Sequence, residues 1–194
     1  MIVNEEKEQK NNTQDSNAGY DKLLKTRSLL LSGEINKDSA DRLIKDLLIL
    51  EGESSDNVTL YINSPGGDVD AGYAIYDMIR FVSCPVTIVG MGLVASAASL
   101  ILLSVPAERR LGLPDSSYLI HQPLSQMKGV ATDIEIHAAQ LDKIKKKINL
   151  LISNATGKSL EQVSADTDRD YWLDAEEAVK YGLISRVVSS RKDI

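Results

Sequence analysis

Among the many serines of the sequence, Ser96 is the first candidate for nucleophilic chemistry. Ser96 follows an apolar, strand-like run and begins an apolar segment of helical character. A hydroxyl at that place lies in the positive field of a helix N-terminus, where the N–H of Ala97 could stabilise an oxyanion. The same position also suits a plain helix cap, which is the commoner role of an isolated serine. The surrounding residues, VASAA over 94–98, lack the Gly-x-Ser-x-Gly pattern of α/β-hydrolases.

Two histidines, His121 and His137, are the only imidazole bases in the sequence. His121 follows a short apolar run and precedes Gln122-Pro123, where a strand ends and its side chains can reach a cleft. His137 lies among apolar residues of a predicted long helix. An isolated histidine is more often structural, but in a Ser-His-Asp enzyme His121 is the better base for Ser96. Several aspartates could complete such a triad, and spacing alone selects none of them.

The turn Pro65-Gly66-Gly67 is a third candidate, because two glycines let the backbone approach a ligand and point N–H groups at it. A plain turn between a strand and a helix explains the same residues equally well. No Gly-Lys-Ser/Thr follows at Walker spacing, and no Gly-x-Gly-x-x-Gly pattern is present. The turn therefore does not indicate a nucleotide site.

Charge and the counts of cysteine and histidine exclude or disfavour several classes of protein. The 194 residues carry 22 basic and 28 acidic side chains, a net charge of −6, which disfavours a nucleic-acid-binding protein. Cys84 is the only cysteine, so an internal disulfide and a multi-cysteine zinc site are excluded, and we interpret Cys84 as a core residue rather than a nucleophile. With only two histidines, no metal site is expected. No signal-peptide pattern or membrane-spanning run occurs, so we expect a cytoplasmic protein without a membrane partner.

Residues 1–18 are polar and predict a flexible N-terminal arm before a single domain over 19–194. Within the domain, strands alternate with helices, which predicts an α/β fold with largely parallel strands. Strands are expected near 29–31, 58–62, 86–89, 118–120 and 184–188, with Gly90 and Gly92 ending the third. Helices are expected from 37 (capped by Asp38 or Ser39), near 74–82, from 96, over 131–154 and near 175–181. Lysines at 143 and 145–147 in the longest helix are interpreted as a solvated face.

Several longer segments resemble the Clp protease (ClpP) family. They are YINSPGG at 61–67, AGYAIYD at 71–77, LIHQPL at 119–124, ATDIEIHA at 131–138, DTDRD at 166–170 and AEEA at 175–178. The similarity extends over 20–188, with the motifs in the family's order and spacing. It implies the ClpP or crotonase-like α/β fold, a repeated β-β-α superhelix from which a long "handle" helix, here 131–154, projects.

The resemblance also implies site residues. Ser96 matches the family's nucleophile, His121 its general base and Asp170 the acid that orients the histidine. The backbone N–H groups of Gly67 and Ala97 match the oxyanion hole. Two segments match those that hold the substrate extended between them. One is a strand after Gly67, with Asp68 and Val69, and the other follows Pro123, with Leu124 and Ser125. No metal or organic cofactor is implied.

The implied function is that of a serine endopeptidase subunit that degrades unfolded proteins and peptides inside a barrel of two stacked seven-subunit rings, a tetradecamer joined through the handle helix. Asp168 and Arg169 match residues that pair across the ring interface. ATP is used by a partner AAA+ unfoldase and not by this chain. The cleft in which that partner docks is matched by Tyr61, Phe81, Val89, Met91, Leu113 and Val188.

Departures from the family pattern leave two alternatives open. Ala97 and Ala98 replace the usual Met-Gly after the nucleophile, Val94 adds bulk before it, and Ser125-Gln126 replace two glycines. Such divergence suits a partner-dependent or regulatory ClpP paralogue in a mixed barrel. A crotonase-type acyl-CoA enzyme is a further alternative, which predicts coenzyme A binding and no effect of Ser96→Ala.

Overall fold

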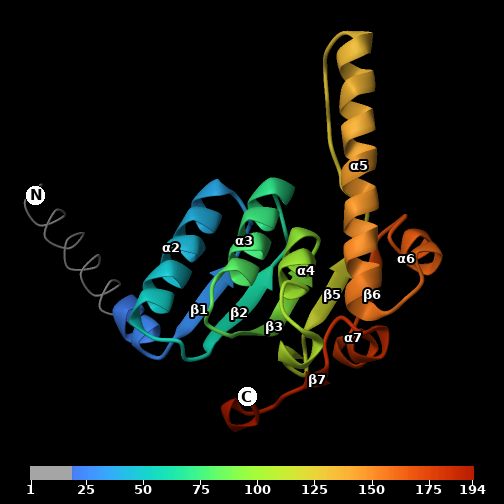
Figure 1. The fold of residues 1–194 in the computed structure, drawn as a ribbon. Coiled ribbons are helices and arrows are strands. Elements are labelled where there is room, and N and C mark those ends of the chain that lie inside the picture. The colour runs from blue at the N-terminus through green and yellow to red at the C-terminus, as the bar shows by residue number, and fades with distance from the viewer. Residues whose placement is uncertain (1–18) are drawn as a thin grey trace, which may run out of the picture.

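Seven strands form one sheet in the computed structural model, which describes residues 19–194 (Figure 1). The predicted arm, 1–18, lies outside the described residues. The strands are β1 (Ser28–Ser32), β2 (Val58–Ser64), β3 (Val86–Ala95), β4 (Arg110–Gly112), β5 (Ser117–Ile120), β6 (Tyr171–Leu173) and β7 (Arg186–Val187). Their order is β1-β2-β3-β4-β7, and β5 pairs with both β3 and β6. All pairings are parallel except that of β5 with β6, as the alternation of strands and helices predicts.

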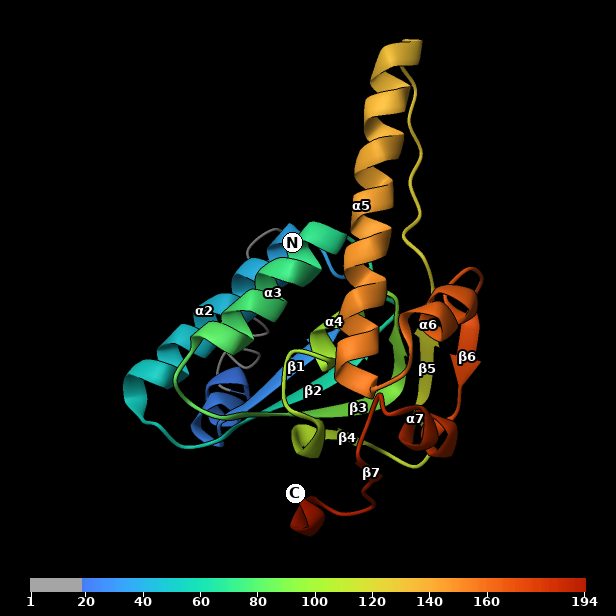
Figure 2. The same ribbon diagram turned by 45° about the vertical axis from the view of Figure 1, so that its right-hand side comes forward.

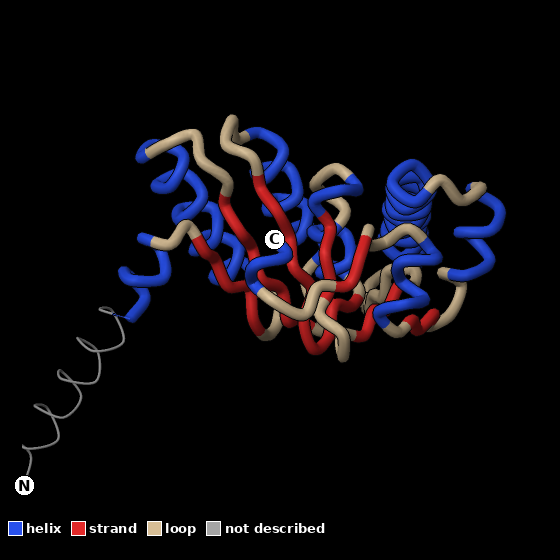
Figure 3. Tube along the Cα trace, turned by 90° about the horizontal axis from the view of Figure 1, so that it is seen from below, coloured by secondary structure: helices blue, strands red, loops and turns tan. Residues whose placement is uncertain are grey.

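Helices connect the parallel strands. They are α2 (Lys37–Glu53), α3 (Val69–Phe81), α4 (Ala97–Leu102), α5 (Ala131–Thr156), α6 (Leu160–Asp166) and α7 (Ala175–Tyr181), and residues 19–25 are also helical. In Figure 1, α2, α3 and α4 lie above β1, β2 and β3, whereas the C-terminal residues pass below the sheet. Figure 3, seen from below, shows the strands as a layer with the helices behind them.

Side chains alternate between the two faces of the sheet along each strand, and the apolar ones lie mainly on the face covered by the helices. Val58, Leu60 and Ile62 of β2 are fully buried in the main core beneath the helices, together with Ile88 of β3. Tyr61, between Leu60 and Ile62, points to the other face because successive strand residues alternate. This other face carries a second, smaller apolar cluster, described below.

Strand β3 does not end at Gly90 and Gly92, so that prediction is wrong. It continues to Ala95, and its two halves pair with different strands: Ile88–Gly90 with β4 and Leu93–Ala95 with β5. Gly92 has φ +57°, and the Asn63 side-chain oxygen accepts the next N–H, that of Leu93, at 3.2 Å. The glycine permits a local turn of the backbone that redirects the strand, and the redirected end of β3 leads directly to Ser96.

Most predicted elements are confirmed, with corrections at their ends. The cap of α2 is Asn36 rather than Asp38 or Ser39: its side chain accepts the Ser39 N–H, and the Ser39 hydroxyl accepts the Asn36 N–H in return. The short elements β4, β6 and α6 were not predicted. With three to seven residues each, they are too short to show a hydrophobic period.

The predicted handle helix is confirmed as α5, which has 26 residues and extends to Thr156. Only its C-terminal part is packed, through Ile148, Asn149 and Ile152, whereas Ile136 is 65% exposed. The rest of the helix projects from the molecule, and the segment that precedes it runs back alongside (Figure 2). Within residues 19–194, none of the helices combines the length and apolar character that a bilayer crossing demands.

Candidate active site

Ser96, His121 and Asp170 form a chain of hydrogen bonds. The Ser96 Oγ lies 2.8 Å from His121 Nε2, and His121 Nδ1 lies 3.1 Å from Asp170 Oδ1. Because a carboxylate only accepts, Nδ1 carries the proton and Nε2 is free to accept the proton of the serine hydroxyl. The His121 side chain is 14% exposed and that of Asp170 is 63% exposed, so the serine–histidine end of the chain is the better shielded.

The backbone of Ser96 is strained. Its φ of +55° and ψ of −122° lie in a region that residues with a side chain rarely adopt, and its N–H bonds to Leu119 O at 2.9 Å. Although Ser96 precedes α4, its side chain makes no capping hydrogen bond. The interpretation of Ser96 as a plain helix cap is therefore wrong, because its hydroxyl is directed to His121 instead.

Ser99 fixes this turn and was missed by the sequence analysis. It is 1% exposed, and its hydroxyl lies 3.1 Å from Val94 O and 2.9 Å from Leu119 O. It thereby ties the first turn of α4 to the ends of β3 and β5. A buried serine within an apolar helix three residues after Ser96 is the signal that could have identified it.

Pairing of β5 with β6 brings the acid to the histidine. These strands are antiparallel with Ile120 opposite Tyr171, so His121 and Asp170 are the next pair along. The neighbouring Gln122 fastens the same loop, since its N–H donates to Thr167 O at 2.7 Å and its Nε2 to Asp168 O at 2.6 Å. Asp170 was predicted only through the family resemblance, because the pairing of these short strands cannot be deduced from the spacing of residues.

The glycine turn lies against the serine. A Cβ added to Gly66 would be 2.6 Å from Ser96 Cβ and 3.0 Å from the Ala97 nitrogen, so only glycine allows this approach. Ile35 donates its N–H to Gly66 O and accepts that of Asp68, both at 2.8 Å. In such a parallel bridge the N–H of Gly67 points away from Ile35. The N–H of Ala97, first in α4, has no partner within its helix.

An apolar recess adjoins the Ser96 hydroxyl. It is small, about 20 Å³, and is lined by Val69, Ser96, Ala97, Ser99, Leu100, Ile120, His121, Pro123, Ile148 and Ile152. Ile148 and Ile152 come from the base of α5, so the handle helix forms one wall of the recess. A peptide carbonyl at Ser96 would therefore have an apolar side-chain site beside it.

The comparisons with known proteins agree on one family. The sequence model of the Clp protease family matches residues 9–191. The chain belongs to the Clp protease family. It is 56% identical over 193 residues to the ATP-dependent Clp protease proteolytic subunit 2 of Treponema denticola, covering 99% of this chain and 96% of that protein. Subunit 2 of Treponema pallidum is 57% identical over 176 residues, covering 90% and 88% of the two chains.

A solved structure gives the same result. The structure of a mutant of ClpP1 from Listeria monocytogenes matches with a TM-score of 0.84 and 45% identity, covering 89% of this chain and 96% of that chain. The predicted crotonase-like α/β fold of ClpP and the predicted family are thus confirmed. Membership identifies the chain as a peptidase subunit of the Clp type.

One part of the substrate-strand prediction is wrong. The residues after Gly67 form no strand: Asp68 is the N-cap of α3, its side chain accepting the Ala71 N–H at 2.7 Å, and Val69 is the first helical residue. In the other segment, Leu124 is 82% exposed, and Ser125 Oγ lies 2.6 Å from His137 Nε2 on α5. Contact of these four residues with a Clp substrate stays a prediction.

The residues predicted for the ring interface of the Clp assembly lie on the surface of the described chain. Asp168 pairs with Lys145 of α5 at 3.5 Å, and its side chain is 60% exposed. Arg169 is exposed between Asp168 and the acid Asp170. The loop that carries the acid is therefore also the loop predicted to meet another ring.

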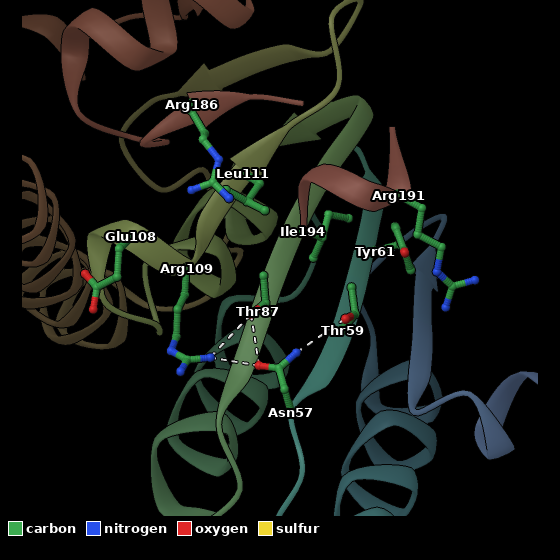
Figure 4. Close-up of a pocket in the computed structure, with 10 residues that line it drawn as sticks. All are labelled: Asn57, Thr59, Tyr61, Thr87, Glu108, Arg109, Leu111, Arg186, Arg191 and Ile194. Atoms are coloured by element: carbon green, nitrogen blue, oxygen red, sulfur yellow. Dashed lines mark hydrogen bonds between the residues drawn. The ribbon is translucent and has the colours of Figure 1, made fainter. Parts of the chain in front are cut away.

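Four of the six residues predicted for the unfoldase-docking cleft of ClpP lie together. Val89 and Val188 are buried with Leu111 in the small cluster on the lower face of the sheet, and Tyr61 and Leu113 pack against it. Phe81 is 80% exposed and lies outside this cluster, as does Met91. Figure 4 shows the adjoining cavity of about 580 Å³, in which Tyr61 and Leu111 share the wall with Arg109, Arg186 and Arg191. Docking itself stays a prediction.

Two sequence interpretations concern side chains outside the triad. Within residues 19–194, no group of three or more His, Cys, Asp or Glu could hold a metal ion. Cys84 is free and 3% exposed in the main core, which confirms its interpretation as a core residue.

Proposed function

We propose that Ser96, His121 and Asp170 are the catalytic triad of a serine endopeptidase that cleaves unfolded polypeptides. The observation that carries the proposal is the 2.8 Å contact of Ser96 Oγ with His121 Nε2. A serine hydroxyl is a weak nucleophile until a base at hydrogen-bond distance removes its proton. The 3.1 Å bond from Nδ1 to Asp170 supports the tautomer that this step requires.

The reaction is acyl transfer to the serine and then to water. Ser96 Oγ attacks the peptide carbonyl carbon while its proton passes to His121 Nε2. The carbonyl oxygen becomes an oxyanion, which the N–H groups of Gly67 and Ala97 are proposed to bind. His121 then gives its proton to the leaving amine, and water, activated by the same imidazole, releases the acyl group. No step needs a metal or organic cofactor.

The recess beside Ser96 suits a small apolar side chain before the scissile bond, because its walls are mainly Val69, Leu100, Ile120 and Ile148. Asp68, Val69, Leu124 and Ser125 are proposed to line the path of the extended substrate backbone. Recognition of the backbone rather than of side chains is compatible with a broad range of unfolded substrates.

The proposed working form is a cytoplasmic barrel of two stacked seven-subunit rings. The projecting, apolar surface of α5 supports contact between rings, with Asp168 and Arg169 at that interface. An AAA+ unfoldase, which uses the ATP, is proposed to dock over the cluster of Tyr61, Val89, Leu113 and Val188, with Phe81 and Met91 contributed by the same or a neighbouring subunit.

A second candidate is a partner-dependent subunit of a mixed barrel. It is favoured by the Treponema relatives, which are numbered as subunit 2, and by Val94, Ala97 and Ala98 around the nucleophile. The test is hydrolysis of an unfolded, fluorescently labelled polypeptide by the purified protein, with Ser96→Ala as control and with or without a second ClpP. Activity of this protein alone that Ser96→Ala abolishes supports the endopeptidase. Activity only in the mixture supports partner dependence. Equal activity of the Ser96→Ala protein alone would refute the endopeptidase. A mixture no more active than the second ClpP by itself would refute partner dependence.

A further inference from the structure

A cleft of about 690 Å³ lies away from the triad, between α3, the segment after α4 and the base of α5. Its lining comes from α3, from residues 103–107 after α4 and from α5, the elements that Figure 2 shows beside one another. One wall is apolar and includes Leu103, Val105, Leu150 and Leu151, and Leu150 is 51% exposed. A volume of this size is typical of small-molecule sites.

The polar lining of the cleft is mainly cationic, although the chain as a whole is acidic. Arg80, Arg110 and Lys147 face a single carboxylate, Asp77. Within residues 19–194, neither Arg80 nor Lys147 has a carboxylate within 4.0 Å. Lys147 is exposed, as the interpretation of its lysine cluster as a solvated face predicted, and it also lines this cleft.

Both cations rest on tyrosine rings instead. Lys147 Nζ lies 3.7 Å from the ring centroid of Tyr73, and the Arg80 guanidinium carbon lies 5.5 Å from that of Tyr76. A cation on an aromatic face keeps its full charge, so it can still attract an anion. The lining of the cleft therefore keeps a net positive charge, because three cations face the single carboxylate of Asp77.

Two buried donors of the same lining also have no partner. Tyr73 is 9% exposed and Arg110 is 3% exposed, and among residues 19–194 neither the Tyr73 hydroxyl nor the Arg110 Nε has a hydrogen-bond partner. The other Arg110 nitrogens bond to Ala155 O at 3.0 Å and Gly182 O at 3.1 Å, the C-terminal ends of α5 and α7. Burial raises the pKa of Tyr73 to about 12, so its hydroxyl stays protonated. Unpaired buried donors are costly, and an acceptor in the cleft would relieve that cost after a small side-chain rotation.

We propose that this cleft is a binding site for a carboxylate carried on a small apolar body, with Lys147 and Arg80 attracting the carboxylate and Leu150 and Leu151 contacting the body. The carboxylate belongs either to a free small molecule or to an acidic residue of a second copy of this chain. The site is independent of the triad and does not rest on the proposed peptidase chemistry.

The test uses N-acetyl-leucine as the probe and N-acetyl-leucinamide, which has the same body without the charge, as its control. Binding is measured by isothermal titration calorimetry at low salt, with Ser96 blocked by a fluorophosphonate. The Arg80→Gln/Lys147→Gln protein removes both cations. The Arg42→Gln/Lys146→Gln protein is its matched control, because it loses the same charge from exposed positions outside the lining. Sedimentation velocity on the same proteins measures self-association.

Two results together support the site with a free ligand. N-acetyl-leucine binds at least tenfold more tightly than the amide, and its binding weakens at least tenfold in Arg80→Gln/Lys147→Gln but not in the control variant. Self-association weakened only in Arg80→Gln/Lys147→Gln supports a carboxylate from a second copy. If both probes bind equally, or if neither binding nor self-association distinguishes the two double variants, the proposal is wrong.

Discussion

Adding one methyl group at Gly66 is expected to reduce peptidase activity about 100-fold without unfolding the protein. A Cβ there would lie 2.6 Å from Ser96 Cβ and 2.7 Å from Ala95 O, whereas ordinary contacts begin at 3.4 Å. Ser96 must therefore move by about 0.8 Å, the difference between 3.4 and 2.6 Å. Displacement of a reacting group by about 1 Å costs about 10²-fold in rate, which corresponds to about 2.7 kcal/mol of transition-state stabilisation.

The Gly66→Ala protein also gains backbone strain, because Gly66 has φ +91° and an L-residue there costs about 1–2 kcal/mol. Gly33→Ala is the matched control: Gly33 has φ +85°, but nothing lies within 4 Å of an added Cβ. Both proteins are expected to remain folded, with the larger loss of stability in Gly66→Ala because of the added clash, and only Gly66→Ala is expected to lose kcat, measured on a short fluorogenic peptide. Near-normal kcat in Gly66→Ala, or an equal loss in Gly33→Ala, would refute the argument that this close approach positions the serine.

Three further predictions follow from single contacts. Asp170→Asn is expected to lower kcat about 10⁴-fold with little change in KM, because an amide favours the wrong histidine tautomer; a loss below tenfold in steady-state kinetics contradicts the triad. Arg110→Met is expected to lower the free energy of unfolding by about 2 kcal/mol, because it leaves two part-buried carbonyls at the ends of α5 and α7 without their donors; an unchanged urea midpoint contradicts this. The Ser83 N–H and hydroxyl donate to the Glu51 carboxylate and lower its pKa below the ordinary value of 4.5. These hydrogen bonds to the ionised carboxylate therefore stabilise the folded protein above that pH, and this stabilisation is lost as the pH falls. The difference in Tm between wild type and Glu51→Gln should therefore shrink between pH 6 and pH 3.5, and a constant difference contradicts it.

The alternation of strands and helices was sufficient to predict the α/β class and most of the longer elements. The period of apolar residues gave α5 within two residues of its C-terminal end, because a 26-residue helix shows its stripe many times. The same reasoning was wrong for strand β3. Glycines such as Gly90 and Gly92 usually end a strand, but here β3 continues past both of them because it pairs with β2, β4 and β5. The three-residue strands β4 and β6 depend wholly on partners distant in sequence.

The site was predictable only in part from the types of residue. Local sequence pointed to Ser96 and preferred His121, but it left a helix cap and a structural histidine as alternatives. The acid could not be selected, because Asp170 reaches His121 only through the pairing of β5 with β6. The supporting contacts of Ser99 and Gln122 were missed for the same reason, since both are made to backbone groups of other strands and loops.

The central claim, that Ser96 is activated by His121, is tested most directly by intact mass spectrometry after incubation with a fluorophosphonate. A single adduct per chain is expected on the wild-type protein, and no adduct on Ser96→Ala or on His121→Ala under the same conditions. Ser83→Ala removes an exposed hydroxyl outside the site and retains the triad, so it serves as the serine control and is expected to keep the adduct. An adduct that persists in Ser96→Ala, or labelling of wild type and His121→Ala at the same rate, would contradict the account.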